Sequence, residues 1–310
     1  MIRLDRISVW LFIISFILLL PGIKFLKMAD ECIALSFLLL ALADCTVNGN
    51  WRDYRLLWTI MAVMTFYALY SAVTVHSNNL TAILSDWIIQ LKPYIPFAVL
   101  ISIRPSLTPA DRTILKISSC LIALISAVIL LSGQETANLL VQHIAYPGCI
   151  LFISAMTYIL VSTDSEGRLS ALDKGIAIAM LTAGLGCFRA KYYGIYILCL
   201  FFLLVYKPGV MRRFSLKYAV TIVAVCAAFI YVSWGKIEYY FLSGNMGTFD
   251  PNVIDSYARP VLYNTGIEIF TDFFPFGSGL ASFASFMSSE YYSDIYYHSV
   301  SYTHLRAHET

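Results

Sequence analysis

TILKISSCLIALISAVILLS, residues 113–132, contains a single charged side chain, Lys116. A helix of about 20 apolar residues spans the hydrocarbon core of a bilayer, which is about 30 Å thick. Within that core every backbone N–H and C=O group needs a partner, and a helix supplies these partners from its own chain. The stretch therefore predicts a membrane-spanning helix, and similar runs recur before and after it.

The composition of the whole chain agrees with a membrane environment. Of its 310 residues, 59% are hydrophobic and 13% are charged, whereas about a quarter of the residues in an average soluble domain are charged. The formal net charge of +2 indicates no polybasic surface, so nucleic acid is not an expected partner. The seven cysteines lie in or beside apolar runs without the spacing of metal ligands, so we expect buried thiols and no metal site.

Nine apolar runs predict nine transmembrane helices. The ten-residue alternation of a membrane β-barrel is absent from the sequence, so the expected fold is all-α, a polytopic integral membrane protein. The first run follows basic residues and lacks a small-residue cleavage site, which indicates an uncleaved span. The runs lie at residues 7–23, 32–46, 56–75, 80–103, 113–132, 147–163, 175–188, 190–206 and 218–234.

The basic residues predict the orientation of these helices. If the N-terminus is cytoplasmic, 13 of the 21 Lys and Arg residues lie in inside segments, seven lie in outside segments and Lys92 lies within a span. Such an excess of inside charge favours a cytoplasmic N-terminus. Residues 1–234 then form a transmembrane domain, and residues 235–298 form a large extracytoplasmic loop with amphipathic helices.

The last ten residues, 301–310, depart from this pattern. They are polar, and they stop without a closing span. We expect them to be a non-native tail, and we expect the native protein to continue with further spans.

Two cations, Arg189 and Lys191, interrupt the charge pattern at a tight turn between the seventh and eighth predicted helices. They either reach out to lipid phosphates or form a fixed cationic site at the outer membrane face. A guanidinium suits the second role, because its planar fork makes paired hydrogen bonds to phosphate oxygens. Arg189 is therefore a candidate catalytic residue, and Lys191 a candidate substrate-binding residue, at a lipid-linked diphosphate.

A third cation, Arg259, lies in the large loop on the same predicted side of the membrane. A proline follows it, and apolar residues then recur at near-helical spacing at Leu262, Tyr263, Ile267 and Phe270. This pattern predicts an amphipathic helix with Arg259 just before its first turn. Arg259 is either a solvated surface side chain or a second clamp for the same anion.

Aromatic residues are frequent in this loop, and Tyr257 and Tyr263 flank Arg259. Such rings either form a belt at the membrane interface or stack on sugars in an open groove. Tyr257 and Tyr263 are the candidates for binding a sugar substrate. His298, near the end of the loop, is a candidate general base.

Several other polar features have simpler interpretations. The turn-rich stretch 274–279, FPFGSG, follows no strand that would make it a nucleotide loop, so its expected role is close packing of loop backbone against a span. His76 and His143 are lone residues at outside edges and are interpreted as interfacial polar side chains. Lys92 and the prolines beside it predict a break in the run 80–103, and Lys92 is either part of that kink or a functional cation.

Three segments resemble the bacterial O-antigen ligase and O-antigen polymerase family of polytopic glycan-assembly proteins. Residues 187–190, CFRA, take the place of the family's Ser-Arg-small motif, with Phe188 where the family usually has serine. Residues 257–263, YARPVLY, are similar to its Arg-x-x-Leu-aromatic segment. Residues 272–283, DFFPFGSGLASF, are similar to its Asp-x-Pro-x-Phe-Gly-x-Gly-x-x-x-Phe signature, the most specific of the three. His298 would correspond to the family's loop histidine.

The resemblance implies glycan transfer from an undecaprenyl-diphosphate-linked oligosaccharide to an acceptor glycan or lipid, at the periplasmic face of the bacterial inner membrane. It implies no nucleotide sugar, metal or other cofactor. Arg189 and Arg259 would neutralise the charge that develops on the diphosphate, and a loop base, for which His298 is the candidate, would activate the acceptor hydroxyl.

Two other classes of protein remain as alternatives. A flippase for lipid-linked oligosaccharides would also bind a diphosphate, but it should show repeated halves and cations in midplane helices. The sequence has no evident internal repeat, and its cations cluster at one outer face, which favours the enzyme. A purely structural subunit would leave the two outer arginines unexplained.

Overall fold

The computed structural model describes residues 4–19, 28–141, 143–164, 167–204 and 265–295, with a few isolated positions between 220 and 234. Within these residues the chain forms helices and no strand, which confirms the all-α class. The chain divides into two compact units. The first comprises Met1–Ile33 and Pro105–Trp234, and the second comprises Ala34–Arg104 and Gly235–Thr310.

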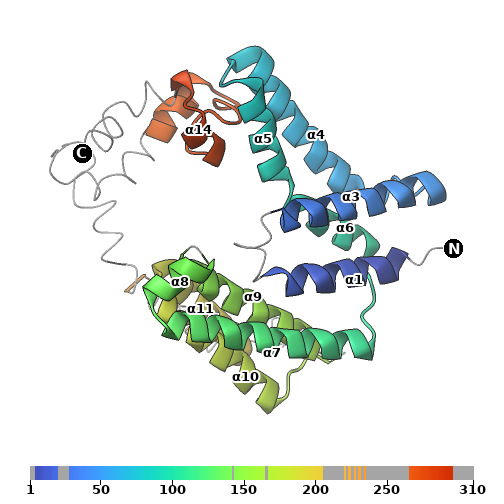
Figure 1. Cartoon of the computed structure of the whole chain (residues 1–310), viewed down its shortest axis with the longest axis vertical. Coiled ribbons are helices and arrows are strands. Elements are labelled where there is room, and N and C mark those ends of the chain that lie inside the picture. The colour runs from blue at the N-terminus through green and yellow to red at the C-terminus, as the bar shows by residue number, and fades with distance from the viewer. Residues whose placement is uncertain are drawn as a thin grey trace. The chain divides into compact units, whose positions relative to one another are not determined.

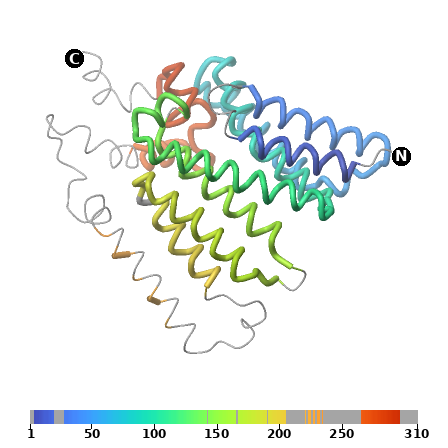
Figure 2. Tube along the Cα trace, turned by 60° about the horizontal axis from the view of Figure 1, so that its bottom comes forward, coloured from blue at the N-terminus to red at the C-terminus, as the bar shows by residue number. Residues whose placement is uncertain are grey.

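The first unit is built around a group of apolar helices. Helix α7 packs along α9, α10 packs against α9, and α11 adjoins α10 (Figures 1 and 2). The N-terminal helix α1 also contacts α7. The bounds of the elements are α1 Leu4–Ile17, α7 Pro109–Leu131, α8 Gln134–Val141, α9 Ala145–Ser162, α10 Ala171–Ala183, the 3₁₀-helix η2 Gly184–Cys187 and α11 Ala190–Leu204.

Polar caps explain why two of these helices begin before their apolar runs. The Thr108 hydroxyl accepts a hydrogen bond from the Asp111 N–H, and the Asp111 carboxylate accepts one from the Thr108 N–H at 2.8 Å. This capping box starts α7 four residues before the predicted run at 113–132. Ser170 caps α10 in a similar way by accepting from the Asp173 N–H at 3.1 Å.

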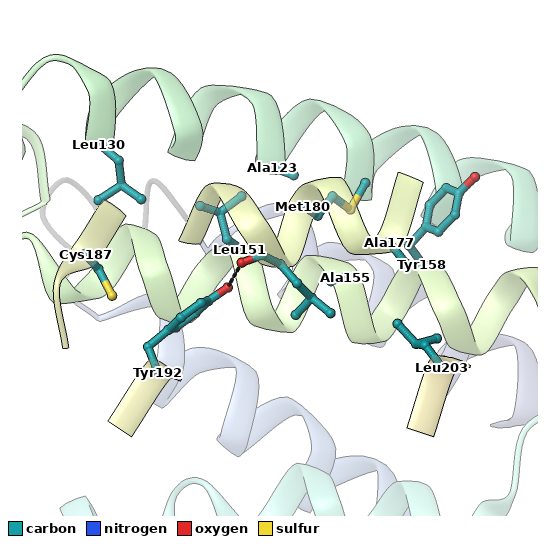
Figure 3. Packing of buried hydrophobic residues seen from close by; sticks show 11 residues of the cluster. Ala123, Leu130, Leu151, Ala155, Tyr158, Ala177, Met180, Cys187, Tyr192 and Leu203 are labelled. Atoms are coloured by element: carbon teal, nitrogen blue, oxygen red, sulfur yellow. Dashed lines mark hydrogen bonds between the residues drawn. The ribbon is translucent and has the colours of Figure 1, made fainter. Parts of the chain in front are cut away.

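The core of the first unit lies between α7, α9, α10 and α11. Figure 3 shows side chains of these helices meeting there, Leu151 and Met180 among them. Small residues are buried on two of these helices: Ser119 and Ser126 of α7 and Ser154 of α9 are fully buried. Small side chains let helix backbones approach closely, which is how transmembrane helices commonly associate without a hydrophobic driving force.

The second unit contains α3 and a pair of longer interrupted helices. Helix α5 ends at Leu91 and α6 begins at Tyr94, so the break predicted at Lys92 is confirmed. Helix α4 contacts both α5 and α6. The bounds are α3 Ala29–Asn48, α4 Arg55–Tyr70, the π-helix η1 Ser71–Val75, α5 Leu80–Leu91, α6 Tyr94–Ile103 and α14 Phe286–Glu290, with the first residues of α3 assigned to the first unit.

The turn-rich segment after residue 274 packs against η1 and α5, and Figure 1 shows α14 beside α5. Leu280 donates its N–H to the Ser71 hydroxyl at 2.6 Å, and the Ser77 hydroxyl donates to the Leu280 carbonyl at 2.8 Å. A Cβ on Gly279 would overlap the Ser71 hydroxyl and lie 3.3 Å from the Ser71 Cα. The predicted close packing of this loop backbone against a span is therefore confirmed.

Within the described residues, four helices are long and apolar enough to cross a membrane, and they indicate a membrane protein. They are Arg55–Val75, Leu80–Ile103, Pro109–Leu131 and Ala145–Ser162, and Lys191–Leu204 is a shorter apolar helix.

The other predicted spans have different outcomes. The runs at 7–23, 32–46 and 175–188 correspond to α1, α3 and α10 with η2, which are helical but outside this set of four. The last run, most of the large loop and the tail at 301–310 lie mainly or wholly outside the described residues. The predicted connection 133–146 contains a helix, α8, that the hydropathy pattern did not reveal.

Candidate anion-binding site

Arg189 lies in the turn between η2 and α11, where its carbonyl begins the helix. That carbonyl accepts hydrogen bonds from the Tyr192 N–H at 2.9 Å and the Tyr193 N–H at 3.3 Å. The N–H groups of the first helical turn have no partner within the helix, and the helix dipole makes this end partly positive. Arg189 therefore stands at an end of α11 that attracts anions.

Close backbone approaches fix this turn to the rest of the first unit. A Cβ on Gly148 of α9 would lie 2.8 Å from the Cys187 Cβ and 2.9 Å from its Sγ, so only glycine lets the two elements meet. Gly184 leaves room for the ring of Tyr192, whose hydroxyl donates to the Leu181 carbonyl at 2.9 Å (Figure 3). These contacts hold the turn on both sides of Arg189, through Cys187 before it and Tyr192 after it.

Phe188, the residue before Arg189, has a left-handed backbone with φ of 50°. This conformation costs a non-glycine residue about 1–2 kcal/mol, and the Phe188 side chain is exposed and packs into no core that would compensate for it. The contacts of Cys187 and Tyr192 keep this strained backbone in place. Strained residues of this kind cluster at functional sites. Phe188 ends η2, and its N–H donates to the Leu185 carbonyl at 3.1 Å, so its left-handed backbone turns the chain towards α11 with Arg189 in the turn.

The Arg189 side chain meets His143, which lies in the turn between α8 and α9. The Arg189 Nη2 atom is 2.7 Å from the His143 Nε2 atom. On its other side, His143 Nδ1 accepts a hydrogen bond from the N–H of Ala145 at 3.0 Å. Within the described part of the chain, Arg189 is paired with no carboxylate. The structure thus brings together two groups from turns 46 residues apart.

Lys191 is exposed on the first turn of α11. Cations are disfavoured at a helix N-terminus, because the dipole there is already positive. Both Arg189 and Lys191 occupy this unfavourable end. A bound anion would reverse the penalty, which supports the interpretation of this turn as an anion site. No contact in the described residues joins the Lys191 side chain to Arg189 or His143.

The remaining predicted site residues, Arg259, Tyr257, Tyr263 and His298, lie outside the described residues. Residues 265–272 are helical, in agreement with the later part of the amphipathic helix predicted after Arg259. Among the described residues, no group of three or more His, Cys, Asp or Glu side chains could hold a metal ion.

A second polar feature lies in the other unit, at Asp86 of α5. Its side chain is buried, and its Oδ2 atom accepts a hydrogen bond from the Ala281 N–H at 2.8 Å. The Oδ1 atom makes no hydrogen bond to any described residue. Asp86 lies within the candidate span Leu80–Ile103. An ionisable side chain at such a position commonly marks a functional site.

The chain matches no protein-family model, no curated protein sequence and no solved structure. The chemistry of the site is therefore inferred from its own residues. Arg189 was anticipated from charge placement, whereas His143 was interpreted as an interfacial side chain. The sequence carries no spacing signal that links the two, and only their shared position at predicted outside edges could have suggested it.

Proposed function

We propose that this protein transfers a glycan from an undecaprenyl-diphosphate-linked oligosaccharide to an acceptor glycan or lipid, as O-antigen polymerases and ligases do. The observation that carries the proposal is the pairing of Arg189 with His143 at the N-terminal end of α11. Hydrogen-bond donors and positive charge meet there, beside apolar helices, with no described carboxylate to neutralise them. A diphosphate on a membrane lipid suits both the charge and the location.

The chemistry requires help mainly at the leaving group. When the bond between the sugar and the diphosphate breaks, negative charge develops on a diphosphate oxygen. Preorganised donors aimed at developing charge are the largest single source of catalysis in many enzymes, and removing one commonly costs roughly 2.7–4 kcal/mol. Arg189 would supply one such donor. Arg259 would supply a second, Tyr257 and Tyr263 would contact sugar, and His298 would accept the acceptor proton.

The proposal places Arg189 at the periplasmic side of the inner membrane, with nine spans and a cytoplasmic N-terminus. The excess of Lys and Arg in the inside segments supports this orientation. A periplasmic reporter fused after Asn245 should be active, and one fused after Arg213 should be inactive. The reverse result would put Arg189 on the side away from the acceptor.

The activity can be tested with purified full-length protein in detergent. We expect glycan transfer from the undecaprenyl-diphosphate donor, with release of the carrier diphosphate and without nucleotide or added metal. Arg189→Ala should slow transfer by about 100- to 1,000-fold, and Arg189→Lys should fail almost as badly because lysine lacks the planar fork. Lys174→Ala, a cation on the first turn of α10, is the matched control and should retain transfer.

Transport of a lipid-linked oligosaccharide is the second candidate, and Asp86 is the observation that favours it. A buried carboxylate with one unpartnered oxygen, in a span interrupted between α5 and α6, is typical of ion-coupled transporters. A transporter would move the donor lipid across a sealed vesicle and would transfer no glycan in detergent. That combination of results would replace the enzyme with a flippase.

A further inference from the structure

We infer that Asp86 of α5 binds one monovalent cation, a proton or an alkali-metal ion, on its Oδ1 atom. The site belongs to a different unit from Arg189 and takes a ligand of opposite charge, so it does not depend on the proposed function. Its basis is a comparison of the three buried carboxylates among the described residues, which are Asp44, Asp86 and Asp111.

The carboxylate of Asp44, in α3, has hydrogen-bond donors on both oxygens. Its Oδ1 atom accepts from the side-chain amides of Asn48 at 2.7 Å and Asn50 at 3.1 Å, and its Oδ2 atom accepts from the Tyr54 hydroxyl at 2.8 Å. Hydrogen bonds of this kind offset the cost of removing a carboxylate from water. Asp44 therefore has no need of a further ligand.

The carboxylate of Asp111, in α7, is neutralised by a cation of the chain itself. The Arg6 guanidinium donates from Nη1 to Oδ2 at 2.6 Å and from Nη2 to Oδ1 at 3.1 Å. The Thr108 hydroxyl and N–H also donate to Oδ2. Such a bidentate pair supplies both the counter-charge and the hydrogen bonds that a buried carboxylate requires.

Asp86 has neither kind of support. Its side chain is 1% exposed, and the Ala281 N–H donates to its Oδ2 atom at 2.8 Å. The Oδ1 atom is buried without a hydrogen bond to any described residue, and no described Lys, Arg or His forms an ion pair with the carboxylate. A buried charge without a partner is strongly unfavourable. A cation on Oδ1 removes that penalty.

The surroundings of Asp86 are apolar. Ala82 and Ile83 lie one turn before it on the same face of α5, and both belong to a cluster with Ala281. The loop 277–285 has no titratable side chain. The titratable groups on the other elements around α5 make no hydrogen bond to Asp86, and they are Arg55, Tyr67 and Tyr70 of α4, Tyr94 of α6, Glu290 of α14, and His76 and Lys92 in the adjoining turns.

The ligand set selects a single positive charge. Among the described residues, no group of three or more His, Cys, Asp or Glu side chains could hold a metal ion, and one carboxylate balances one positive charge. The nearby carbonyls of Leu280 and Ala281 already accept hydrogen bonds from Ser77 and Asn78. An alkali-metal ion would have to share these oxygens, whereas a proton requires Oδ1 alone.

Infrared spectroscopy of the full chain in detergent tests for the proton. In choline chloride near neutral pH, a protonated Asp86 should give a carboxyl C=O band that is absent from Asp86→Asn. The asparagine oxygen can still accept from the Ala281 N–H, so this variant should fold. Aspartate labelled with ¹³C at its side-chain carboxyl should shift the band, which assigns it to aspartate without any variant.

Thermal unfolding tests for the alkali-metal ion. Replacing choline by sodium at constant ionic strength should raise the melting temperature of the wild type and leave that of Asp86→Asn unchanged. With free sodium at 100 times its dissociation constant, the ratio of folded to unfolded protein should rise by about 100-fold. The infrared band identifies a proton, the sodium effect identifies an alkali-metal ion, and either one supports the site.

Asp44→Asn is the matched control, because it removes a buried carboxylate whose two oxygens already have donors. It should keep whichever signal the wild type shows. Absence of both signals in the wild type would overturn the inference, and so would signals that persist unchanged in Asp86→Asn.

Glycan transfer by the same purified protein separates the cation site from the proposed function. Either cation signal without transfer would support the site at Asp86 and refute the transferase. Transfer without either signal would refute the cation site alone.

Discussion

Gly279→Ala should open the loop that packs on η1, because the structure leaves no space for a methyl group there. Gly279 has φ of 82°, which costs an alanine about 1–2 kcal/mol. The new Cβ would displace the Ser71 hydroxyl, which donates to the Tyr67 carbonyl and accepts from the Leu280 N–H, each at 2.6 Å. Losing both hydrogen bonds adds about 2–3 kcal/mol. The expected total is about 3–5 kcal/mol.

Gly277→Ala is the matched control in the same loop. Its φ of 72° imposes a similar backbone penalty, but the nearest atom to its Cβ is 3.8 Å away, on Phe270. The two variants should therefore differ by about 2–3 kcal/mol, or roughly 30- to 150-fold in the equilibrium for opening. Amide hydrogen exchange of peptides covering Leu280, measured by mass spectrometry in detergent, reports this opening.

Equal exchange in the two alanine variants would refute the steric argument. Ser71→Ala provides an internal check, because it removes the hydroxyl that the new methyl would strike. The double variant with Gly279→Ala should lose less than the sum of the single variants.

Three other changes test separate parts of the molecule. Asp86→Asn keeps an oxygen for the loop N–H and replaces a buried ionisable group by a neutral one, so the melting temperature in detergent should stay level or rise, whereas Asp86→Leu should lower it. Gly184→Ala would place a methyl against the Tyr192 hydroxyl and 2.8 Å from its Cε1, so the turn carrying the anion site should shift and diphosphate affinity should fall by up to about 100-fold. The Ser170 and Tyr158 hydroxyls, both donating to the Asp173 carboxylate, lower the pKa of Asp173 from its ordinary value of 3.8. A depressed carboxyl pKa stabilises the folded state above pH 3.8, and this stabilisation is lost as the pH falls through the pKa of the folded state. Ser170→Ala should therefore lower the free energy of unfolding at neutral pH. Below about pH 4 this loss should shrink to the part that comes from the missing helix cap, as measured by acid unfolding.

Hydropathy and proline chemistry were sufficient to predict most of the described helices. The run at 113–132 became α7, and the prolines after Lys92 gave the break between α5 and α6. Helix starts were less accurate, since the caps at Thr108 and Ser170 are polar and fall outside an apolar run. Helix α8 was missed because it is short and mixes polar with apolar residues.

The candidate site was predicted only in part. Arg189 interrupts a charge pattern that can be counted along the chain, so it could be found without a structure. His143 could not, because its role arises from a fold that brings a turn 46 residues away within hydrogen-bonding distance. The other ring nitrogen of His143 lies 3.0 Å from the backbone N–H of Ala145, and backbone donors leave no mark in the sequence. The role of Asp86 could not be predicted from the sequence either, because its partner is the Ala281 backbone N–H, 195 positions further along the chain.

The contact between Ser77 and Leu280 has a consequence for how the protein is made. These residues are 203 positions apart, and Pro105–Trp234 of the first unit is synthesised between them. At about 5–20 residues per second, roughly 10–40 seconds of translation separate the two halves of the second unit. During that interval Asp86 has already left the ribosome while its Ala281 partner has not yet been made. The second unit is therefore expected to finish folding only after its first helices have entered the membrane. If the ribosome stalls before residue 281, insertases or membrane chaperones should hold the nascent chains.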